Sequence, residues 1–261
     1  VKRFGLHPRA QSGHYQRHLD TATGVNLNTE RKKRYLVPVP GHHKYDNSRA
    51  LHDVMVNVPH EVLNQELLSN LEMMASVPNV EWPPAYHNNP IVQRSDTPMM
   101  PLALYIDGVP STKKDGMIGV WMYSLVSMKR HLICVLRKSA LCRCGCKGWD
   151  SIHPIMAKLR LSLGSMLKGR YPHRRRDNQP WRGCPNQRSN LAGSALYVKG
   201  VLLHIRGDRL ELCSTLGFPT WADLGHPCIF CKIIKANMDK FDGLSPLRSV
   251  SPLVTPADYD D

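Results

Sequence analysis

The stretch "LALYIDGVP" (residues 102–110) is apolar from Leu102 to Ile106 and then places a carboxylate, Asp107, directly before Gly108. A short continuous apolar run of this kind is typical of a strand buried on both faces. We therefore predict a buried strand that ends at Asp107. The alternative is purely structural: Asp107 and Gly108 begin a turn, for which both residue types are favoured.

Three further elements follow this run. The apolar segments 117–127 and 131–139 are joined to it and to each other by short polar turns, which predicts a three-stranded antiparallel meander. Residues 151–169 carry apolar side chains at spacings of three and four, which predicts a helix with one apolar stripe. A second apolar strand, 201–205, is again followed by a carboxylate, Asp208.

The order of these elements matches an α/β fold with a ribonuclease-H-like core, in which the first and fourth strands are parallel neighbours. Asp107 and Asp208 would then lie close together, where two like charges repel unless a divalent cation holds them. We predict both as catalytic ligands of Mg²⁺ or Mn²⁺ for phosphodiester cleavage or strand transfer. For Asp208 the alternative is a cap on the helix that follows it.

The rest of the chain divides into segments that differ in composition. Residues 1–50 are polar, basic and rich in histidine, and we expect an extended arm there, because prolines keep its apolar segment "YLVPVP" from being a central strand. Residues 51–100 predict a short amphipathic helix that starts after Pro59, and then a connecting loop rich in Pro and Asn. We assign 101–235 to the ribonuclease-H-like domain with Cys-rich insertions.

The positive charge is concentrated in one part of the chain. The formal net charge is +14, and the segment from Lys113 to Arg188, with 17 Lys/Arg and 3 Asp/Glu, carries all of this excess. Such clustering favours a nucleic-acid partner, although a solvated basic face without a partner has the same composition. The densest run, "KGRYPHRRR" (168–176), also fits a nuclear-import patch or a disordered basic loop. The residues predicted to contact phosphates are Lys113, Lys114, Arg137, Lys138, Arg174, Arg175 and Arg176.

Most of the eight cysteines lie in or beside two tight clusters, which favours metal binding over disulfides. In "LCRCGCKGW", Cys142, Cys144 and Cys146 alternate, and glycines let the backbone fold around a small centre. Three thiolates need a fourth ligand for tetrahedral Zn²⁺. Candidates for the fourth ligand are Cys184, His153 and His131, and the sequence does not choose among them.

The second cluster, "HPCIFC", is half of a zinc site. Cys228 and Cys231 have the two-residue gap that turns both sulfurs toward one ion, and His226 is a possible third donor. Two buried thiols without metal are the alternative. Cys134 and Cys213 lie within an apolar strand and a helix, and we expect them in the core.

The segments "DGVPSTKKDGMIGVWMYSL…RHLICVLRKS" and "GD…TLGFPTW…HPCIFC" together resemble the catalytic region of CACTA-type DNA transposases, above all divergent copies in protist genomes. The resemblance spans roughly residues 100–235. It implies a ribonuclease-H-like core with a DDE acid triad that cuts and joins DNA with Mg²⁺ or Mn²⁺. The first catalytic role would fall to Asp107 and the second to Asp208, with Glu211 as the local alternative to Asp208.

The third acid of the triad has no clear match. The acids after Cys231 lie outside any strong helical pattern, so we expect either a fragment that stops before the glutamate or a copy that binds DNA without cutting it. The start at Val1 and the polar, proline-broken tail 236–261 also suggest a fragment.

Several partners and locations follow from these features. The resemblance and the basic run imply DNA as a partner and a nuclear location, and they are compatible with a homo-oligomer. No apolar run approaches the roughly 18–20 residues needed to cross a bilayer, so we expect no membrane partner. A zinc-stabilised nucleic-acid-binding protein without catalysis is the main alternative to a transposase.

Overall fold

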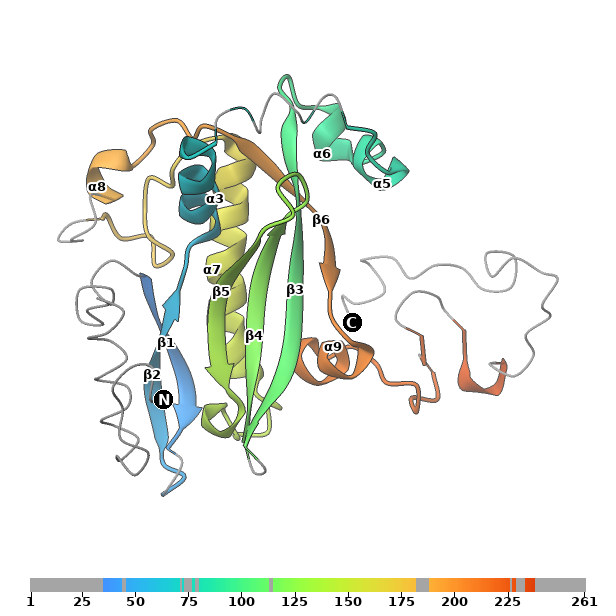
Figure 1. Cartoon of the computed structure of the whole chain (residues 1–261). Coiled ribbons are helices and arrows are strands. Elements are labelled where there is room, and N and C mark those ends of the chain that lie inside the picture. The colour runs from blue at the N-terminus through green and yellow to red at the C-terminus, as the bar shows by residue number, and fades with distance from the viewer. Residues whose placement is uncertain are drawn as a thin grey trace, which may run out of the picture.

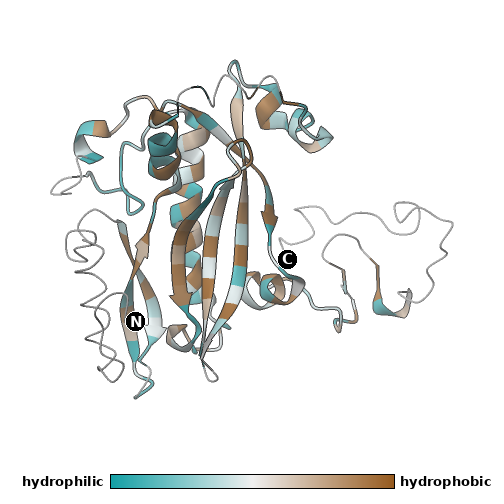
Figure 2. Cartoon of the chain, viewed as in Figure 1, coloured by the Kyte–Doolittle hydropathy of each residue, from teal (hydrophilic) through white to brown (hydrophobic). Residues whose placement is uncertain are grey.

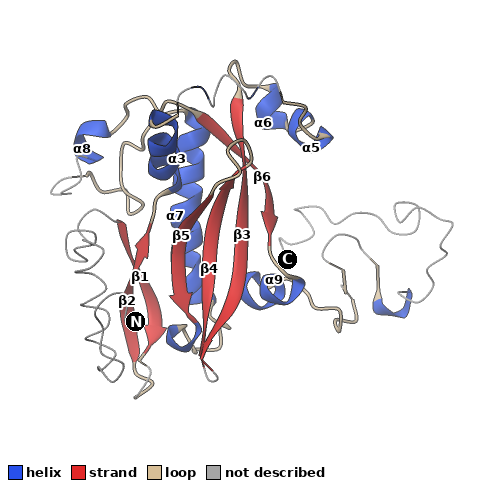
Figure 3. Ribbon diagram, viewed as in Figure 1, coloured by secondary structure: helices blue, strands red, loops and turns tan. Residues whose placement is uncertain are grey.

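The computed structural model describes residues 35–43, 46–70, 72, 77, 80–112, 115–181, 188–225, 227–228 and 233–237. Two β-sheets and one long helix dominate this part of the chain (Figures 1 and 3). The strands are β1 (Tyr35–His42), β2 (Arg49–Val56), β3 (Met99–Thr112), β4 (Asp115–Ser124), β5 (Arg130–Arg137) and β6 (Lys199–Arg206). The helices are α3 (Pro59–Leu68), α5 (Pro84–His87), α6 (Pro90–Gln93), α7 (Trp149–Lys168), α8 (Arg188–Leu191) and α9 (Arg209–Leu216), with 3-10 turns η3 (Lys138–Ala140) and η4 (Lys235–Asn237).

The main sheet is mixed and has the strand order β5-β4-β3-β6. Strands β3, β4 and β5 are antiparallel neighbours, and β6 pairs with β3 in parallel. The predicted α/β class, the meander and the parallel pairing of the first and fourth strands are therefore confirmed. Helix α7 connects β5 to β6 and crosses one face of the sheet (Figure 1).

Strand β3 is longer than predicted. It continues to Thr112, and Asp107 lies within it, opposite Gly119 of β4. The prediction that the strand ends at Asp107 is wrong, and so is the alternative that a turn begins there. From Tyr105 onward one face of β3 is only partly covered, so a carboxylate is tolerated in mid-strand without the chain having to leave the sheet.

The core lies between the main sheet and α7. Alternate residues of β3, Leu102, Leu104 and Ile106, are buried in the same cluster as Ile155 and Leu159 of α7. Burying a side chain of this size contributes about 1.5–3 kcal/mol. Figure 2 shows the corresponding apolar bands along the strands and on α7. The predicted helix at 151–169 is confirmed, with its start two residues earlier at Trp149.

A β-hairpin precedes the main sheet, where the sequence predicts an extended arm. Strands β1 and β2 pair in antiparallel register from Tyr35 with Val56 to His42 with Arg49. The hairpin therefore spans the predicted boundary between segments 1–50 and 51–100, because residue 50 lies within β2. Its Val37 and Val39 belong to the main core. The prolines of β1 are compatible with this arrangement because β1 is an edge strand of a two-stranded sheet with β2. Residues before Tyr35 lie outside the described part of the chain.

The segment between the sheets is mostly as predicted. Helix α3 begins at Pro59 and buries Leu63 and Leu67, which confirms the expected start and apolar face. The loop rich in Pro and Asn contains the two one-turn helices α5 and α6. None of the helices in the described residues is long and apolar enough to cross a lipid bilayer.

Candidate functional site

Four potential metal ligands converge in the loop before α7. The Sγ atoms of Cys142, Cys144 and Cys146 and a carboxylate oxygen of Asp150 all lie within 4.8 Å of one another. Zn–S bonds of about 2.3 Å place the ligands of a tetrahedral zinc roughly 4 Å apart. The four donors therefore already have the spacing that a zinc ion requires.

The local sequence explains how the loop closes on itself. Gly145 and Gly148 have φ of 101° and 87°, a backbone conformation that favours glycine, and Gly148 is also the N-cap of α7. The Cys146 carbonyl accepts a hydrogen bond from the Trp149 amide at 2.9 Å. Asp150 follows in the first turn of α7, where the helix dipole favours a negative charge.

The surroundings within the cluster favour the thiolate form of Cys146 and disfavour that of Cys144. The backbone amide of Asp150 donates to Cys146 Sγ at 3.5 Å and thereby lowers the pKa of the Cys146 thiol. The Cys146 backbone also acts to lower the pKa of Cys144, but the side chains of Cys142, Cys146 and Asp150 outweigh it and raise this pKa to about 12. Such crowding is what a bound cation relieves.

The fourth donor is one that the sequence analysis missed. Among the predicted fourth ligands, His131 instead lies 2.7 Å from the Glu66 carboxylate, and His153 packs against Trp149. Cys184 lies outside the described residues. The signal for Asp150 was its position four residues after Cys146 and directly before the predicted helix 151–169, near enough in the chain for the glycine-containing loop to bring it to the cysteines.

The cysteine loop is tied to the hairpin. Arg49 of β2 forms an ion pair with Asp150 at 3.3 Å, and the Arg143 amide donates to His42 Nδ1 at 3.0 Å. The Ser151 hydroxyl links both parts, because it donates to the Pro40 carbonyl and accepts from the Cys142 amide. A metal held by this loop would therefore also fix the hairpin.

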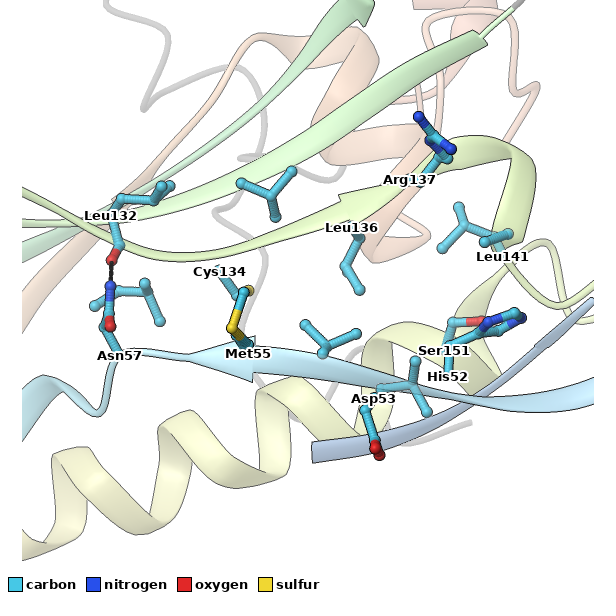
Figure 4. A pocket seen from close by; sticks show the side chains of 15 residues that line it. His52, Asp53, Met55, Asn57, Leu132, Cys134, Leu136, Arg137, Leu141 and Ser151 are labelled. Atoms are coloured by element: carbon cyan, nitrogen blue, oxygen red, sulfur yellow. Dashed lines mark hydrogen bonds between the residues drawn. The ribbon is translucent and has the colours of Figure 1, made fainter. Parts of the chain in front are cut away.

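A pocket of about 330 Å³ separates the hairpin from the main sheet between β2 and β5 (Figure 4). Its walls include Met55 of β2 and Cys134 and Leu136 of β5. Beside it, the side chain of Asn57 donates to the Leu132 carbonyl at 2.7 Å, which holds β2 to β5. Because the pocket leaves β2 only partly packed on β5, the contacts between the hairpin and the cysteine loop contribute more to holding the hairpin in place.

The second predicted cluster falls mostly outside the described residues. His226 and Cys231 are not described, and Cys228 is half-buried. The zinc half-site there stays a prediction. Cys134 is buried, and burial raises its pKa to about 12, so its predicted core position is confirmed. Cys213 is only half-buried on α9 and donates to the Pro219 carbonyl at 3.0 Å.

Of the two predicted catalytic acids, Asp107 lies on β3 and Asp208 follows the end of β6, the parallel neighbour of β3. The β3–β6 pairing ends with Tyr105 opposite Arg206, and the next residue, Gly207, lies against the Ile106 carbonyl. The Tyr105 hydroxyl donates to Asp107 at 2.9 Å. This hydrogen bond raises the pKa of Tyr105, and the charges of both Asp107 and Asp208 raise it further, so the phenol lies within the field of both carboxylates.

Asp208 also has the structural role that the sequence analysis gave as its alternative. It is the N-cap of α9, and its Oδ1 accepts from the Glu211 amide at 2.6 Å. Glu211, the local alternative for catalysis, is buried and forms an ion pair with Lys138 at 2.9 Å, next to Gly108. Its other oxygen accepts from the Thr215 hydroxyl. Glu211 is thus already neutralised by a lysine.

The cap makes a prediction about stability. Replacing Asp208 with Ala removes the acceptor for the Glu211 amide, so the free energy of unfolding should fall by about 1 kcal/mol. Asp208→Asn keeps an acceptor and should stay within a few tenths of wild type. Urea unfolding of the two variants measures the difference, and equal stability of both would exclude the capping role.

The predicted phosphate contacts separate into two groups. Arg137 pairs with Asp115 at 3.4 Å, and Lys138 pairs with Glu211, so both have acidic partners. The run from Arg174 to Arg176 lies in an ordered loop after α7, in which the Arg175 amide donates to the Gln179 carbonyl at 2.9 Å. The disordered-loop alternative for this run is therefore wrong. Lys113 and Lys114 lie outside the described residues.

No protein-family model, curated protein or solved structure matches the chain. What the protein does is therefore inferred from the geometry of its own residues.

Proposed function

We propose that this chain is a DNA transposase-like protein with a ribonuclease-H-like core, and that Asp107 and Asp208 act together in metal-dependent cleavage and transfer of DNA strands. The observation that carries the proposal is their position. Asp107 lies on β3, Asp208 follows directly after the end of the neighbouring parallel strand β6, and Tyr105 lies in the field of both. The strand order β5-β4-β3-β6 with the α7 crossover also supports it.

The donor set fits one divalent ion of the Mg²⁺ type. Mg²⁺ commonly binds one or two carboxylates and keeps water and substrate phosphate oxygens as its other ligands. Asp107 and Asp208 supply two carboxylates, each with one oxygen engaged by a Tyr105 or Glu211 hydrogen bond. When bound, the ion would activate water and stabilise the leaving oxygen.

The chain's own residues prepare the two carboxylates. The Tyr105 hydroxyl orients Asp107, and the first turn of α9 orients Asp208 through the Glu211 amide. The Lys138–Glu211 pair beside Gly108 fixes the start of α9 against β3. In this proposal α9 is therefore a positioning element, and Glu211 holds Lys138 rather than the metal.

The test is Mn²⁺ binding by calorimetry, together with Mn²⁺-dependent cleavage of labelled DNA. Asp107→Asn and Asp208→Asn each remove one charge but keep the hydrogen-bond acceptors that Tyr105 and α9 need. We expect each variant to weaken Mn²⁺ binding at least tenfold and to abolish cleavage. Because the asparagines keep these acceptors, we expect both variants to stay folded, and circular dichroism of the same samples checks this.

The matched control is Asp53→Asn, an exposed carboxylate on the hairpin, which should leave Mn²⁺ binding unchanged. Mn²⁺ binding that is equal in the wild type and both active-site variants would contradict the proposal. The two aspartates would then serve only the sheet and the α9 cap.

A second candidate function is a zinc-stabilised nucleic-acid-binding protein without catalysis. The observation that favours it is the cluster of three cysteines and Asp150, in which Zn²⁺ would be a structural ion. DNA as partner and a nuclear location remain proposals under both functions. DNA binding that persists in both asparagine variants, with no cleavage by the wild type under any divalent metal, would favour this candidate.

A further inference from the structure

A strongly basic groove of about 880 Å³ lies between the second half of α7 and the loop that follows it. Six of its lining residues are cationic, and none is acidic. The cations are Arg160, Lys168, Arg170, Arg174, Arg175 and Arg176. Three of them, Arg160, Lys168 and Arg170, are not among the residues predicted from the sequence to contact phosphates.

The groove is on the side of α7 that faces away from the sheet. Helix residues turn by about 100° each, so the lining positions Arg160, Gly164 and Lys168 fall opposite the buried Ile155 and Leu159. Asp107 and Asp208 belong to the sheet and to the start of α9, at the other end of β6 from the end of α7 (Figure 1). The groove is therefore separate from the acid pair.

Its charge is largely uncompensated. In the described part of the chain, Arg175 is the one groove cation with a carboxylate partner, Asp177 at 3.2 Å. The guanidinium groups of Arg170 and Arg174 instead donate to the Gly193 and Asn178 carbonyls, which orients them without neutralising them. Cations gathered without counter-charges raise the local concentration of anions.

The groove is held in shape by its surroundings. The Tyr171 amide donates to the Ser194 carbonyl at 2.9 Å, and the Tyr171 hydroxyl accepts from Asn64 of α3 at 3.0 Å. Trp181 is buried and donates to the Pro172 carbonyl at 3.0 Å. The wall that carries the arginines is therefore fixed before any ligand arrives, which lowers the entropy cost of binding.

A buried amine lies behind this wall. Lys158 of α7 is fully buried, its Nζ has no hydrogen-bond partner in the described structure, and the charges of Arg175 and Arg176 reach it. A protonated Lys158 adds to the positive field of the groove from inside the protein, where it is less screened than a surface charge.

We propose that this groove binds the sugar-phosphate backbone of one nucleic-acid strand. Arg160 and Lys168 are two helical turns apart, about 12 Å, so they can contact different phosphates of one strand. Arg170, Arg174 and Arg176 also line the groove. A groove of this volume has room for a short strand. The contacts are to phosphates, so binding is independent of base sequence.

The experiment measures the affinity for a labelled 15-nucleotide DNA single strand by fluorescence anisotropy, over a range of salt concentrations and without added Mg²⁺ or Mn²⁺. The background is Asp107→Asn, so the result does not depend on the acid pair. Arg160→Gln with Lys168→Gln should weaken binding roughly tenfold or more at 50 mM salt and reduce the slope of log affinity against log salt by about 1.4. Two different base sequences should show the same loss.

The matched control is Arg94→Gln with Arg130→Gln, which removes the same charge from exposed positions outside the groove. It should change the affinity less than twofold, and Arg160→Lys should bind like wild type. An equal loss in the control would show that only net charge matters and would overturn the proposal. So would tighter binding of the matching duplex, or of phosphatidylserine vesicles, with the same dependence on Arg160 and Lys168. Mn²⁺ binding measured on the groove variants distinguishes failure here from failure of the acid site.

Discussion

A zinc chelator is expected to lower the melting temperature of this chain by roughly 8–16 °C. At a thousandfold excess over its dissociation constant, a ligand that binds only the folded state stabilises it by about 4 kcal/mol. For a domain of this size each kcal/mol shifts the midpoint by about 2–4 °C. The physical reason is that Cys142, Cys144, Cys146 and Asp150 converge within 4.8 Å in the folded chain, so zinc would bind the folded state in preference to the unfolded one.

The stability lost on removal of zinc should affect the hairpin first. Arg49 contacts Asp150, Arg143 contacts His42, and Ser151 contacts Pro40, so the hairpin loses these three contacts when the loop opens and is then held by its core packing and by Asn57. Amide hydrogen exchange in β1 and β2 should therefore accelerate on chelation, while the centre of β3 and β4 keeps its protection. Differential scanning fluorimetry and hydrogen exchange of the same samples measure both effects.

Cysteine variants make the test specific. Cys146→Ser should reproduce the chelated state and abolish the response to chelator, because oxygen replaces one sulfur ligand. Cys213→Ser is the matched control, since Cys213 lies outside the cluster and serine can still donate to the Pro219 carbonyl. A wild-type protein that purifies without zinc and whose melting temperature is unaffected by zinc would contradict a structural metal in this loop.

The sequence predicts the main sheet well because its signals are local. Apolar runs and three-to-four spacing define β3, β4, β5, α7 and β6 without reference to the rest of the chain. The parallel pairing of β3 with β6 then follows from the element order. The hairpin was missed for the converse reason: prolines in β1 argue against a central strand, and the pairing with β2 shows how an edge strand accommodates them.

The candidate sites likewise combine residues that the sequence reveals with residues that only the fold brings to the site. The three cysteines are visible in the sequence, but Asp150 joins them only because the loop folds back onto the first turn of α7. Asp208 was recognised both as an acid and as a cap, and the hydrogen bond to Glu211 establishes the cap. The end of β3 was misplaced at Asp107 because hydropathy alone does not show that one face of a strand is only partly covered.

Lys158 shows most clearly what sequence cannot predict. In the helix 151–169 it reads as an ordinary polar residue, yet it is fully buried, with Nζ 3.5 Å from the centre of the Tyr35 ring and 5.4 Å from that of Trp181. Burial lowers its pKa from 10.5 to about 7; Glu61 opposes this shift, and Arg188, Arg175 and Arg176 add to it. The aromatic rings provide a cation–π interaction, worth about 2 kcal/mol when desolvated.

Lys158→Met is therefore expected to stabilise the protein, by about 1–4 kcal/mol at pH 6. Methionine is unbranched and of similar length, so it fills the same space without a charge. Because the pKa is lowered in the folded state, the wild type is destabilised in full below pH 7 and regains stability as pH rises from 7 toward 10.5. The advantage of methionine should shrink by about 3 kcal/mol between pH 6 and pH 9.

Urea unfolding of both proteins at several pH values gives this difference directly. His60, whose pKa burial lowers to about 3, stays neutral in the folded state over this range, so its titration in the unfolded state contributes equally to both proteins and cancels in their difference. Lys168→Met, an exposed lysine on the same helix, is the matched control and should shift stability by less than about 0.5 kcal/mol at every pH. If Lys158→Met is instead less stable than wild type at both pH values, the rings of Tyr35 and Trp181 compensate fully for the buried charge, and Lys158 belongs to the stabilising core.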